Sequence, residues 1–273
     1  MIINKISHTG FMPVFSFFAC NFMAFSDKIK KEVKCMRVFA ISDLHLSTVA
    51  DKPMDIFGPG WEDHFERITK DWRKKVTEDD LVIVAGDISW GMYLEEAKPD
   101  LDLIGTLPGK IVLLKGNHDY WWKSITAVRN ALPQNMFAVQ NDCIRFDNIL
   151  VCGTRGWTVP ETTFKSNEDE KIFKRELIRL ELSLKEMQKN RKEDDFVIVM
   201  THYPPFNSKM NSSEVTDLIE KYKPDCVIYG HLHGKNCRVK LDYTLNDVRY
   251  LLTSCDQVNC ELVEVDLKKG KND

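Results

Sequence analysis

The stretch MRVFAISDLH, residues Met36 to His45, passes from apolar and β-branched side chains to a carboxylate and an imidazole. An apolar run of this length and composition is typical of a buried β-strand. In open α/β folds, ligands bind in the crevice beyond the carboxyl ends of the strands. The stretch therefore predicts the first strand of an α/β fold and, directly after it, the first residues of a site.

The same arrangement returns at four more apolar runs along the chain: LVIVAG, IVLLKG, FVIVMT and CVIYG. Three of these end in glycine (Gly86, Gly116 and Gly230), which allows a sharp turn and a close approach of the backbone. Each element alone is a weak signal, but five strand ends with metal-capable side chains form a joint pattern. The polar residues at these ends are Asp43, His45, Asp87, Asn117, His118, Asp119, His202, His231 and His233.

Segments with helical spacing separate the strands, and this alternation predicts sheets covered by helices. Further short strands at 136–140, 143–148 and 149–156, and a hairpin-like β tail at 237–254 and 257–267, suggest a second sheet. We expect one domain over residues 36–273, an α/β fold built as a four-layer α/β/β/α sandwich of two mixed sheets flanked by helices. Helices are expected at residues 61–76, 93–107 (broken or kinked at Pro99), 124–132, 168–192 and 212–222.

Composition restricts the function classes. The 273 residues carry a formal net charge of -3, so no basic excess points to nucleic acid as a partner. The eight cysteines form no C-x-x-C pair, and several lie in apolar runs. They are expected to be buried, reduced thiols of a cytoplasmic protein.

Residues 1–35 differ from the rest of the chain. The dense apolar run FMPVFSFFACNFMAF (Phe11 to Phe25) is short for a membrane span, and it resembles the central region of a signal peptide with a poor cleavage site. We interpret residues 1–35 as a leader or disordered extension, with the functional chain beginning at Met36. Export or membrane association through this leader is the alternative to a cytoplasmic location.

The strand-end side chains are suited to metal ions. Burying so many polar groups together is costly unless something pairs with them. Three oxygen ligands and four imidazoles exceed the needs of one tetrahedral zinc, so two divalent ions sharing a carboxylate are predicted. Nitrogen and oxygen ligands without cysteine suit Mn, Fe or Zn.

The blocks DLH, GD, GNHD, TH and GHLH, in this order, resemble the five signature blocks of the calcineurin-like metallophosphoesterases, from about Met36 to Gly234. The resemblance implies the α/β/β/α sandwich and a dinuclear metal centre. It also implies the ligand roles: Asp43, His45 and His233 for the first metal, Asn117, His202 and His231 for the second, and Asp87 bridging both.

The activity implied by the resemblance is phosphoester hydrolysis. A metal-bridging hydroxide would attack phosphorus, and His118 would assist the leaving group, acting on a small phosphomonoester or phosphodiester. Two alternatives stay open: a nuclease acting on DNA or RNA, which the lack of a basic stripe disfavours, and a non-catalytic metal-bound scaffold.

One block departs from the family pattern. In GDISWGM, Trp90 stands where the protein Ser/Thr phosphatase branch has the aspartate that orients the catalytic histidine. Asp119 is predicted as a second catalytic residue beside His118. Arg155, in GTRGW, is a candidate for binding the substrate's phosphate, or for pinning a loop by a salt bridge.

Overall fold

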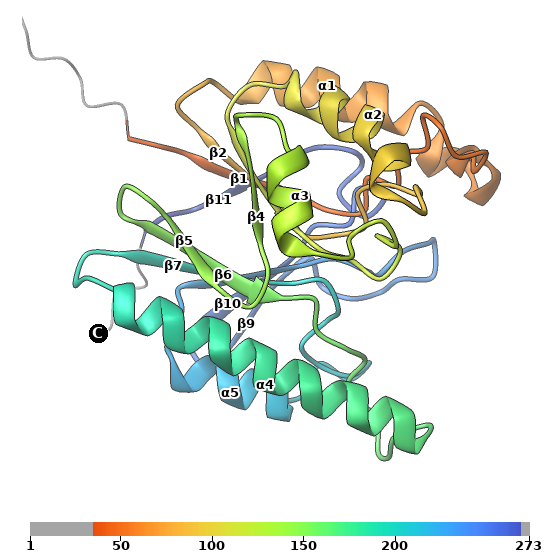
Figure 1. Cartoon of the computed structure of the whole chain (residues 1–273). Coiled ribbons are helices and arrows are strands. Elements are labelled where there is room, and N and C mark those ends of the chain that lie inside the picture. Colours follow the sequence, from red (N-terminus) through yellow and green to blue (C-terminus); the bar gives the residue numbers. More distant parts are fainter. Residues whose placement is uncertain (1–34, 269–273) are drawn as a thin grey trace, which may run out of the picture. The chain divides into compact units, whose positions relative to one another are not determined.

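The computed structural model describes residues 35–268, and its strands form two sheets that pack against each other (Figure 1). The strands are β1 (Val38–Ile41), β2 (Leu81–Val84), β3 (Lys110–Leu114), β4 (Met136–Val139), β5 (Cys143–Phe146), β6 (Ile149–Thr154), β7 (Phe196–Thr201), β8 (Cys226–Tyr229), β9 (Asp242–Leu245), β10 (Val248–Leu252) and β11 (Val263–Val265). The first sheet has the order β11-β1-β2-β3-β4 and the second β5-β6-β7-β8-β10-β9. Both are mixed, because antiparallel strands lie beside a parallel centre: β11 in the first, β5 and β9 in the second.

Helices cover the outer face of each sheet (Figure 1). They are α1 (His64–Lys75), α2 (Leu94–Gly105) and α3 (Ile125–Ala131) over the first sheet, and α4 (Asn167–Asn190) and α5 (Glu214–Lys221) over the second, with short 3-10 turns η1 (Met54–Phe57) and η2 (Pro59–Trp61). Side-chain caps start several of them: Ser124 accepts from the amide of Ala127 at α3, and Ser213 forms a capping box with Thr216 at α5. Within residues 35–268, no helix combines the length and the apolar character that crossing a membrane requires.

Alternation along the strands divides the core into three apolar layers. In β1, Phe39 and Ile41 pack with Trp72 and the other helix residues of the first layer, whereas Val38 and Ala40 pack between the sheets. A third layer lies between the second sheet and α4 and α5. A strand exposes alternate residues to opposite faces, so apolar side chains on both faces require cover on both. The predicted α/β/β/α sandwich of two mixed sheets is confirmed.

Two local predictions need correction. Pro99 does not break α2, because Ala97, Leu101 and Ile104 remain buried and hold the helix against the sheet despite the missing donor. A kink at Pro99 stays a prediction. The C-terminal segment does not form a hairpin of its own: β11 pairs antiparallel with β1, with Val38 opposite Val265, and so covers an edge of the first sheet. The preceding hairpin of β9 and β10 is confirmed.

The two sheets are joined beyond the carboxyl end of β1. Ser42 forms a parallel bridge with Ser254, its amide donates to the carbonyl of Thr253 (2.8 Å), and its carbonyl accepts from the amide of Cys255 (3.1 Å). The residues after β1 therefore lie beside those after β10, which belongs to the second sheet. Polar residues that follow strands of both sheets are thereby brought to one region.

The predicted leader falls, apart from Cys35, outside the described residues. The assignment of residues 36–273 to a single domain and the cytoplasmic location both stay predictions.

Candidate metal centre

The loops after the strands hold four of the predicted ligands in a left-handed backbone conformation, which residues other than glycine rarely adopt. Asp43, His45, Asp87 and His231 have φ values of 60°, 45°, 54° and 74°. Backbone hydrogen bonds fix two of these loops together, since the amide of Asp43 donates to the carbonyl of Gly86 (2.9 Å) and the amide of His45 to that of Asp87 (3.0 Å). A left-handed backbone is strained at a residue other than glycine, and such strained residues are concentrated at functional sites.

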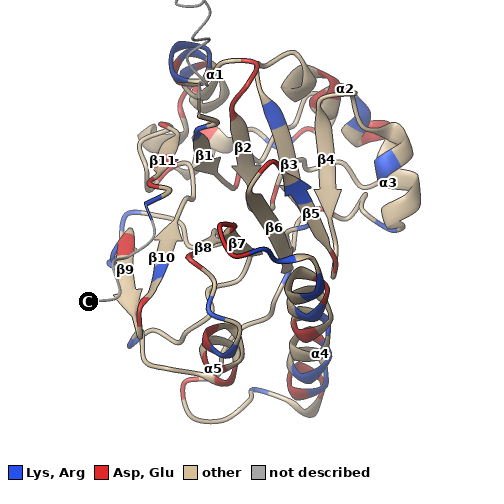
Figure 2. Ribbon diagram, turned by 90° about the vertical axis from the view of Figure 1, so that its left-hand side faces the viewer, with Lys and Arg blue, Asp and Glu red and all other residues tan. Residues whose placement is uncertain are grey.

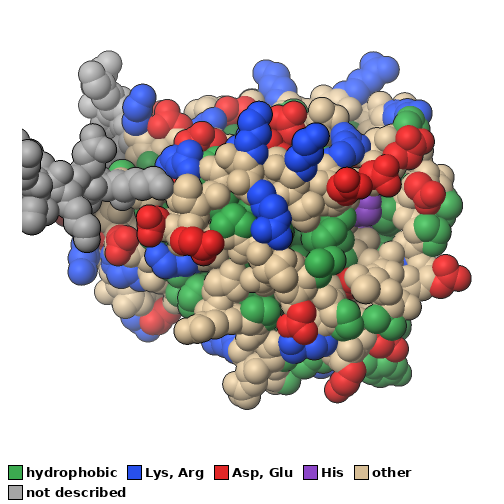
Figure 3. Space-filling view, turned by 90° about the horizontal axis from the view of Figure 1, so that it is seen from above, with side chains coloured by type: hydrophobic (Ala, Val, Ile, Leu, Met, Phe, Trp, Pro, Cys, Tyr) green, Lys and Arg blue, Asp and Glu red, His purple; other side chains and the backbone are tan. Residues whose placement is uncertain are grey.

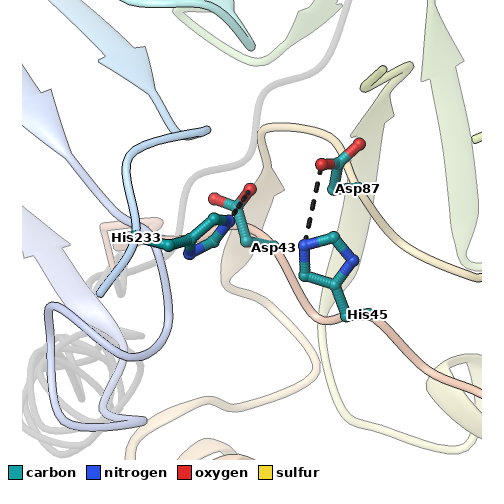
Figure 4. A group of neighbouring side chains, drawn as sticks. All are labelled: Asp43, His45, Asp87 and His233. Atoms are coloured by element: carbon teal, nitrogen blue, oxygen red, sulfur yellow. Dashed lines mark ion pairs between the residues drawn. The ribbon is translucent and has the colours of Figure 1, made fainter. Parts of the chain in front are cut away.

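A first group of ligand atoms comes from Asp43, His45, Asp87 and His233, and these atoms all lie within 4.8 Å of one another (Figure 4). His233 Nε2 is 3.0 Å from Asp43 Oδ1, and His45 Nε2 is 3.6 Å from Asp87 Oδ2. The two aspartates and His45 are buried, while the His233 side chain is 26% exposed. The structure thus gathers the residues expected around the first metal, together with the expected bridging carboxylate.

A second group lies on the other side of Asp87. His202 Nε2 is 2.8 Å from Asn117 Oδ1 and 3.2 Å from Asp87 Oδ2, and His231 Nδ1 is 2.8 Å from the same Asn117 oxygen. Asp87 Oδ2 therefore faces His45 of the first group and His202 of the second. All seven predicted ligands converge on one region, with Asp87 between the two groups.

The hydrogen-bond partners of two histidines show that this arrangement suits cations. His202 Nδ1 lies 2.9 Å from the carbonyl of Ala85, which only accepts, so this nitrogen carries the proton. Its Nε2 faces the oxygens of Asn117 and Asp87, so positive charge is needed between these atoms. A proton on Nε2, which the raised pKa of His202 favours, or a metal cation would supply it. His233 repeats the pattern, with Nδ1 3.0 Å from the Asp256 carboxylate and Nε2 3.0 Å from Asp43 Oδ1.

The electrostatics of the site lead to the same conclusion. Burial alone would lower the pKa of His202 and His233, but the carboxylates of Asp87 and Asp43 outweigh it and raise the values to about 9 and about 10. Burial lowers the pKa of His45 and His231 to about 4, so these two rings are neutral at pH 7. The buried carboxylates are stabilised by nearby positive charge. A metal ion would supply that charge, and the neutral imidazoles of His45 and His231 would donate lone pairs to the ion.

Small residues make room for the ligands. A Cβ on Gly116 would lie 2.1 Å from Asp87 Oδ1, and a Cβ on Gly230 would lie 2.5 Å from Asp43 Oδ2. Any other residue would push the carboxylates out of place. The glycines before the polar residues are thus explained by close approach.

Asp256 is a member of the site that the sequence pattern did not reveal. Its Oδ1 is 3.0 Å from His233 Nδ1, and its Oδ2 accepts from the amides of Gly234 (2.8 Å) and the Gln257 side chain (2.9 Å). A carboxylate behind a ligand histidine fixes its tautomer and its orientation. No spacing motif links Asp256 to His233 in the sequence, so folding alone brings them together.

Replacing Asp256 by Ala should weaken metal binding about 10–100-fold, because His233 loses the partner that orients it. Asp256→Asn, which can still accept a hydrogen bond from the ring, should recover part of this loss. Metal retained during titration with a competing chelator measures the effect, with the exposed Asp266→Asn as control. Equal retention in Asp256→Ala and the parent chain would contradict the role.

His118 lies beside the metal-ligand groups and is oriented by an aromatic ring. Its amide donates to Asp87 Oδ1 (2.8 Å), and its ring lies 4.5 Å from that of Trp90 and 5.5 Å from that of His45, centroid to centroid. Its Nδ1 is buried without a hydrogen-bond partner among the described residues. Trp90 therefore holds His118 by packing, where the protein Ser/Thr phosphatase branch uses an aspartate. Burial lowers the pKa of the imidazole, which keeps it neutral at pH 7.

The catalytic role predicted for Asp119 does not fit its surroundings. The residue is fully buried, and both oxygens accept hydrogen bonds from backbone amides of the loops after β2 and β3. Oδ1 also accepts from Trp121 Nε1 (3.1 Å). Asp119 is thus a positioning residue that ties together the loops carrying Asp87 and Asn117. Consecutive residues point in different directions, and Asp119 points away from the reacting side.

Arg155 contacts neighbouring side chains of the protein. Arg155 lies 3.7 Å from Glu176 and above the ring of Trp157, so the salt-bridge alternative is found. Its phosphate role stays a prediction. Trp121 and Trp122, which follow Asp119 in the sequence, are buried in the core.

The comparisons with known proteins agree with this geometry. The family model described as calcineurin-like phosphoesterase matches residues 36–235, and the chain belongs to this family. The family is metal-dependent, and Asp43, His45, Asp87 and His233 form a candidate metal-binding cluster in this chain.

Solved structures with low sequence identity resemble the chain. The protein TT1561 of Thermus thermophilus is 15% identical, with a TM-score of 0.52 over 85% of this chain and 99% of that one, a likeness that shows the fold. A protein of unknown function from Aquifex aeolicus is 13% identical, with a TM-score of 0.47 over 84% of this chain and 96% of that one. None of the curated proteins compared with the chain matches it.

Proposed function

We propose that the chain is a dinuclear metal-dependent phosphohydrolase that cleaves a small phosphomonoester or phosphodiester. The observation that carries this proposal is the position of Asp87, whose Oδ2 lies 3.6 Å from His45 Nε2 on one side and 3.2 Å from His202 Nε2 on the other. One carboxylate shared by two sets of ligands is what a pair of neighbouring cations needs.

The residues divide between two ions as the family pattern implies. Asp43, His45 and His233 would hold the first ion, with Asp87 shared. When bound, two such cations polarise a phosphoryl group and lower the pKa of a water molecule that attacks it. Mn, Fe or Zn suits the mixture of nitrogen and oxygen ligands. The second ion would be held by Asn117, His202 and His231.

His118 is the group suited to proton transfer. It is half-buried and held against Trp90. The neutral ring can donate a hydrogen bond to the leaving oxygen, whereas full proton donation requires the imidazolium, which burial makes the minor form at pH 7 by lowering the pKa of His118. A general acid in this position contributes about 10²–10⁴-fold to the rate. The hydrogen bond from the His118 amide to Asp87 Oδ1 fixes the position of His118 relative to the shared carboxylate.

A cavity beside the centre supports a small substrate. It measures ≈ 580 Å³, and His231 and His233 form part of its wall together with the loops after β6, β7 and β8. Pockets for small molecules have volumes of about 300–1,000 Å³ and mostly apolar linings. Tyr203, Met210 and Leu232 give this cavity such a lining.

The face seen in Figure 3 gives little support for nucleic acid as the substrate. On the face seen in Figure 3, Lys and Arg are interspersed with Asp and Glu rather than gathered into a stripe. A duplex or single strand is bound chiefly through its phosphates, which requires a continuous basic surface. A small phosphoester is the better match to the cavity.

A substrate screen tests the proposal directly. The full chain is stripped with a chelator, reconstituted with Mn²⁺, Fe²⁺ or Zn²⁺, and assayed on p-nitrophenyl phosphate, bis-p-nitrophenyl phosphate and nucleoside monophosphates. We expect turnover only after metal is added, with two ions per chain at saturation. Two bound ions without turnover on any ester would favour the scaffold alternative, and one ion per chain would contradict the dinuclear centre.

A further inference from the structure

A second cavity, of ≈ 150 Å³, is lined by residues at the ends of β3 and β6 and on α4. The helix α4, with its many charged residues, runs along the second sheet (Figure 2). Although the chain is acidic overall, this cavity is strongly basic. Four of its lining side chains are cations and one is an anion: Lys115, Lys123, Arg155 and Arg179, against Glu176.

The single carboxylate does not satisfy the cations. Glu176 Oε1 accepts from Arg179 (2.5 Å) and lies 3.7 Å from the Arg155 guanidinium, while its Oε2 accepts from the Thr154 hydroxyl (3.0 Å). The Nε of Arg155 is buried and has no hydrogen-bond partner among the described residues. Because Nε is enclosed, an anion in the cavity would meet the exposed part of the Arg155 side chain, which is 22% exposed and has Glu176 only at 3.7 Å.

The two lysines add positive charge with few contacts. Lys115 Nζ donates to the carbonyl of Trp122 (2.6 Å), which occupies one of its three N–H groups. Lys123 is exposed. Like charges held close together repel each other, and a bound anion converts this repulsion into attraction. The cavity has room for several waters of about 30 Å³ each, and hence for one tetrahedral oxyanion.

Two loops that line the cavity also belong to, or contact, the candidate metal centre. Lys115 stands two residues before Asn117 on the loop after β3. The carbonyl of Arg155 accepts from the amides of His202 and Tyr203, both at 3.0 Å. The loops after β3 and β6 thus supply cations to this cavity and also contact, or carry, residues of the candidate centre.

We propose that this cavity binds a phosphate-type oxyanion, supplied either by a second anionic group of the substrate or by free phosphate. The first source rests on the proposed phosphohydrolase function, and the second does not. Arginine forks and lysine ammonium groups are the usual ligands of phosphate oxygens. The phosphate-binding role predicted for Arg155 is thereby assigned to an oxyanion other than the one that is cleaved.

Calorimetric titration of the full chain with inorganic phosphate, after chelator treatment at pH 8 and low salt, tests the site without turnover. We expect saturable binding, weakened about tenfold or more by Arg155→Gln, since hydrogen bonds between charged groups are stronger than those between neutral groups. The exposed Lys123→Gln should weaken binding less and keep the fold. Lys74→Gln, an exposed lysine on α1, is the matched control and should change nothing. Thermal melting of each variant checks that it is folded.

Kinetics then separate the two sources. If the oxyanion belongs to the substrate, Arg155→Gln raises KM for a sugar bisphosphate but not for p-nitrophenyl phosphate. If free phosphate is the ligand, both KM values stay unchanged while the calorimetric affinity falls. The proposal is overturned if chelator-treated chain binds no phosphate, or if Lys123→Gln/Arg155→Gln binds it as tightly as the parent. A chain without turnover that still binds phosphate refutes only the proposed function.

Discussion

Asp87→Asn should abolish metal-dependent turnover and cost the chain at least one ion. The change keeps the shape of the side chain but removes the charge that two cations would share. It also removes the carboxylate that raises the pKa of His202 to about 9, so the second group of ligands loses its attraction for positive charge. We expect metal affinity to fall by more than the ~10–100-fold seen when only a ligand's orienting partner is changed.

The measurement is metal per chain by mass spectrometry, alongside turnover of p-nitrophenyl phosphate. Asp100→Asn is a matched control, because Asp100 is equally buried and accepts hydrogen bonds from Thr48 and Ser89 without belonging to the cluster. The control should keep both ions. If Asp87→Asn retained two ions and full turnover, the assignment of the centre would be wrong.

His118→Ala should lower kcat by about 10²–10⁴-fold on esters with poor leaving groups and leave metal content unchanged. An alkoxide needs a proton as it departs, whereas p-nitrophenolate is stable without one. The loss should therefore be much smaller on p-nitrophenyl phosphate than on an alkyl phosphate. This dependence on the leaving group distinguishes proton donation from a general disturbance of the site.

Two further variants test how His118 is oriented. Trp90→Phe keeps an aromatic ring against His118 and should retain most of kcat, whereas Trp90→Ala should reproduce part of the His118→Ala pattern. Equal losses on good and poor leaving groups for His118→Ala would exclude the general-acid role. Metal content in each variant separates this outcome from loss of the centre.

The sequence predicted the fold class because strands with apolar residues on both faces require cover on both faces. It also predicted the residues that converge at the candidate centre, since each follows a strand and parallel strands end at the same edge. Side-chain direction at individual positions could not be predicted in this way. Asp119 stands next to His118 in sequence, yet its oxygens are saturated by backbone amides away from the reacting side.

Contacts between segments that are far apart in the sequence could not be predicted either. Asp256 follows the last strand of the second sheet and carries no motif, but the fold places it 3.0 Å from His233. Trp90 was recognised as an exception to the family pattern, but nothing in the sequence indicated that its ring would take the place of the missing carboxylate. The pairing of β11 with β1 likewise depends on which sheet edge is free.

The Ser42–Ser254 bridge has a consequence for when the candidate centre can bind metal. Asp43 comes early in the chain and His233 comes late, so the first ligand group is complete only after the two sheets have docked at this bridge. Contacts between residues so far apart in sequence carry a large loop-closure cost and form late in folding. Metal binding is thus expected to follow the synthesis and docking of the C-terminal strands. Each bound ion would then stabilise the contact between the two sheets.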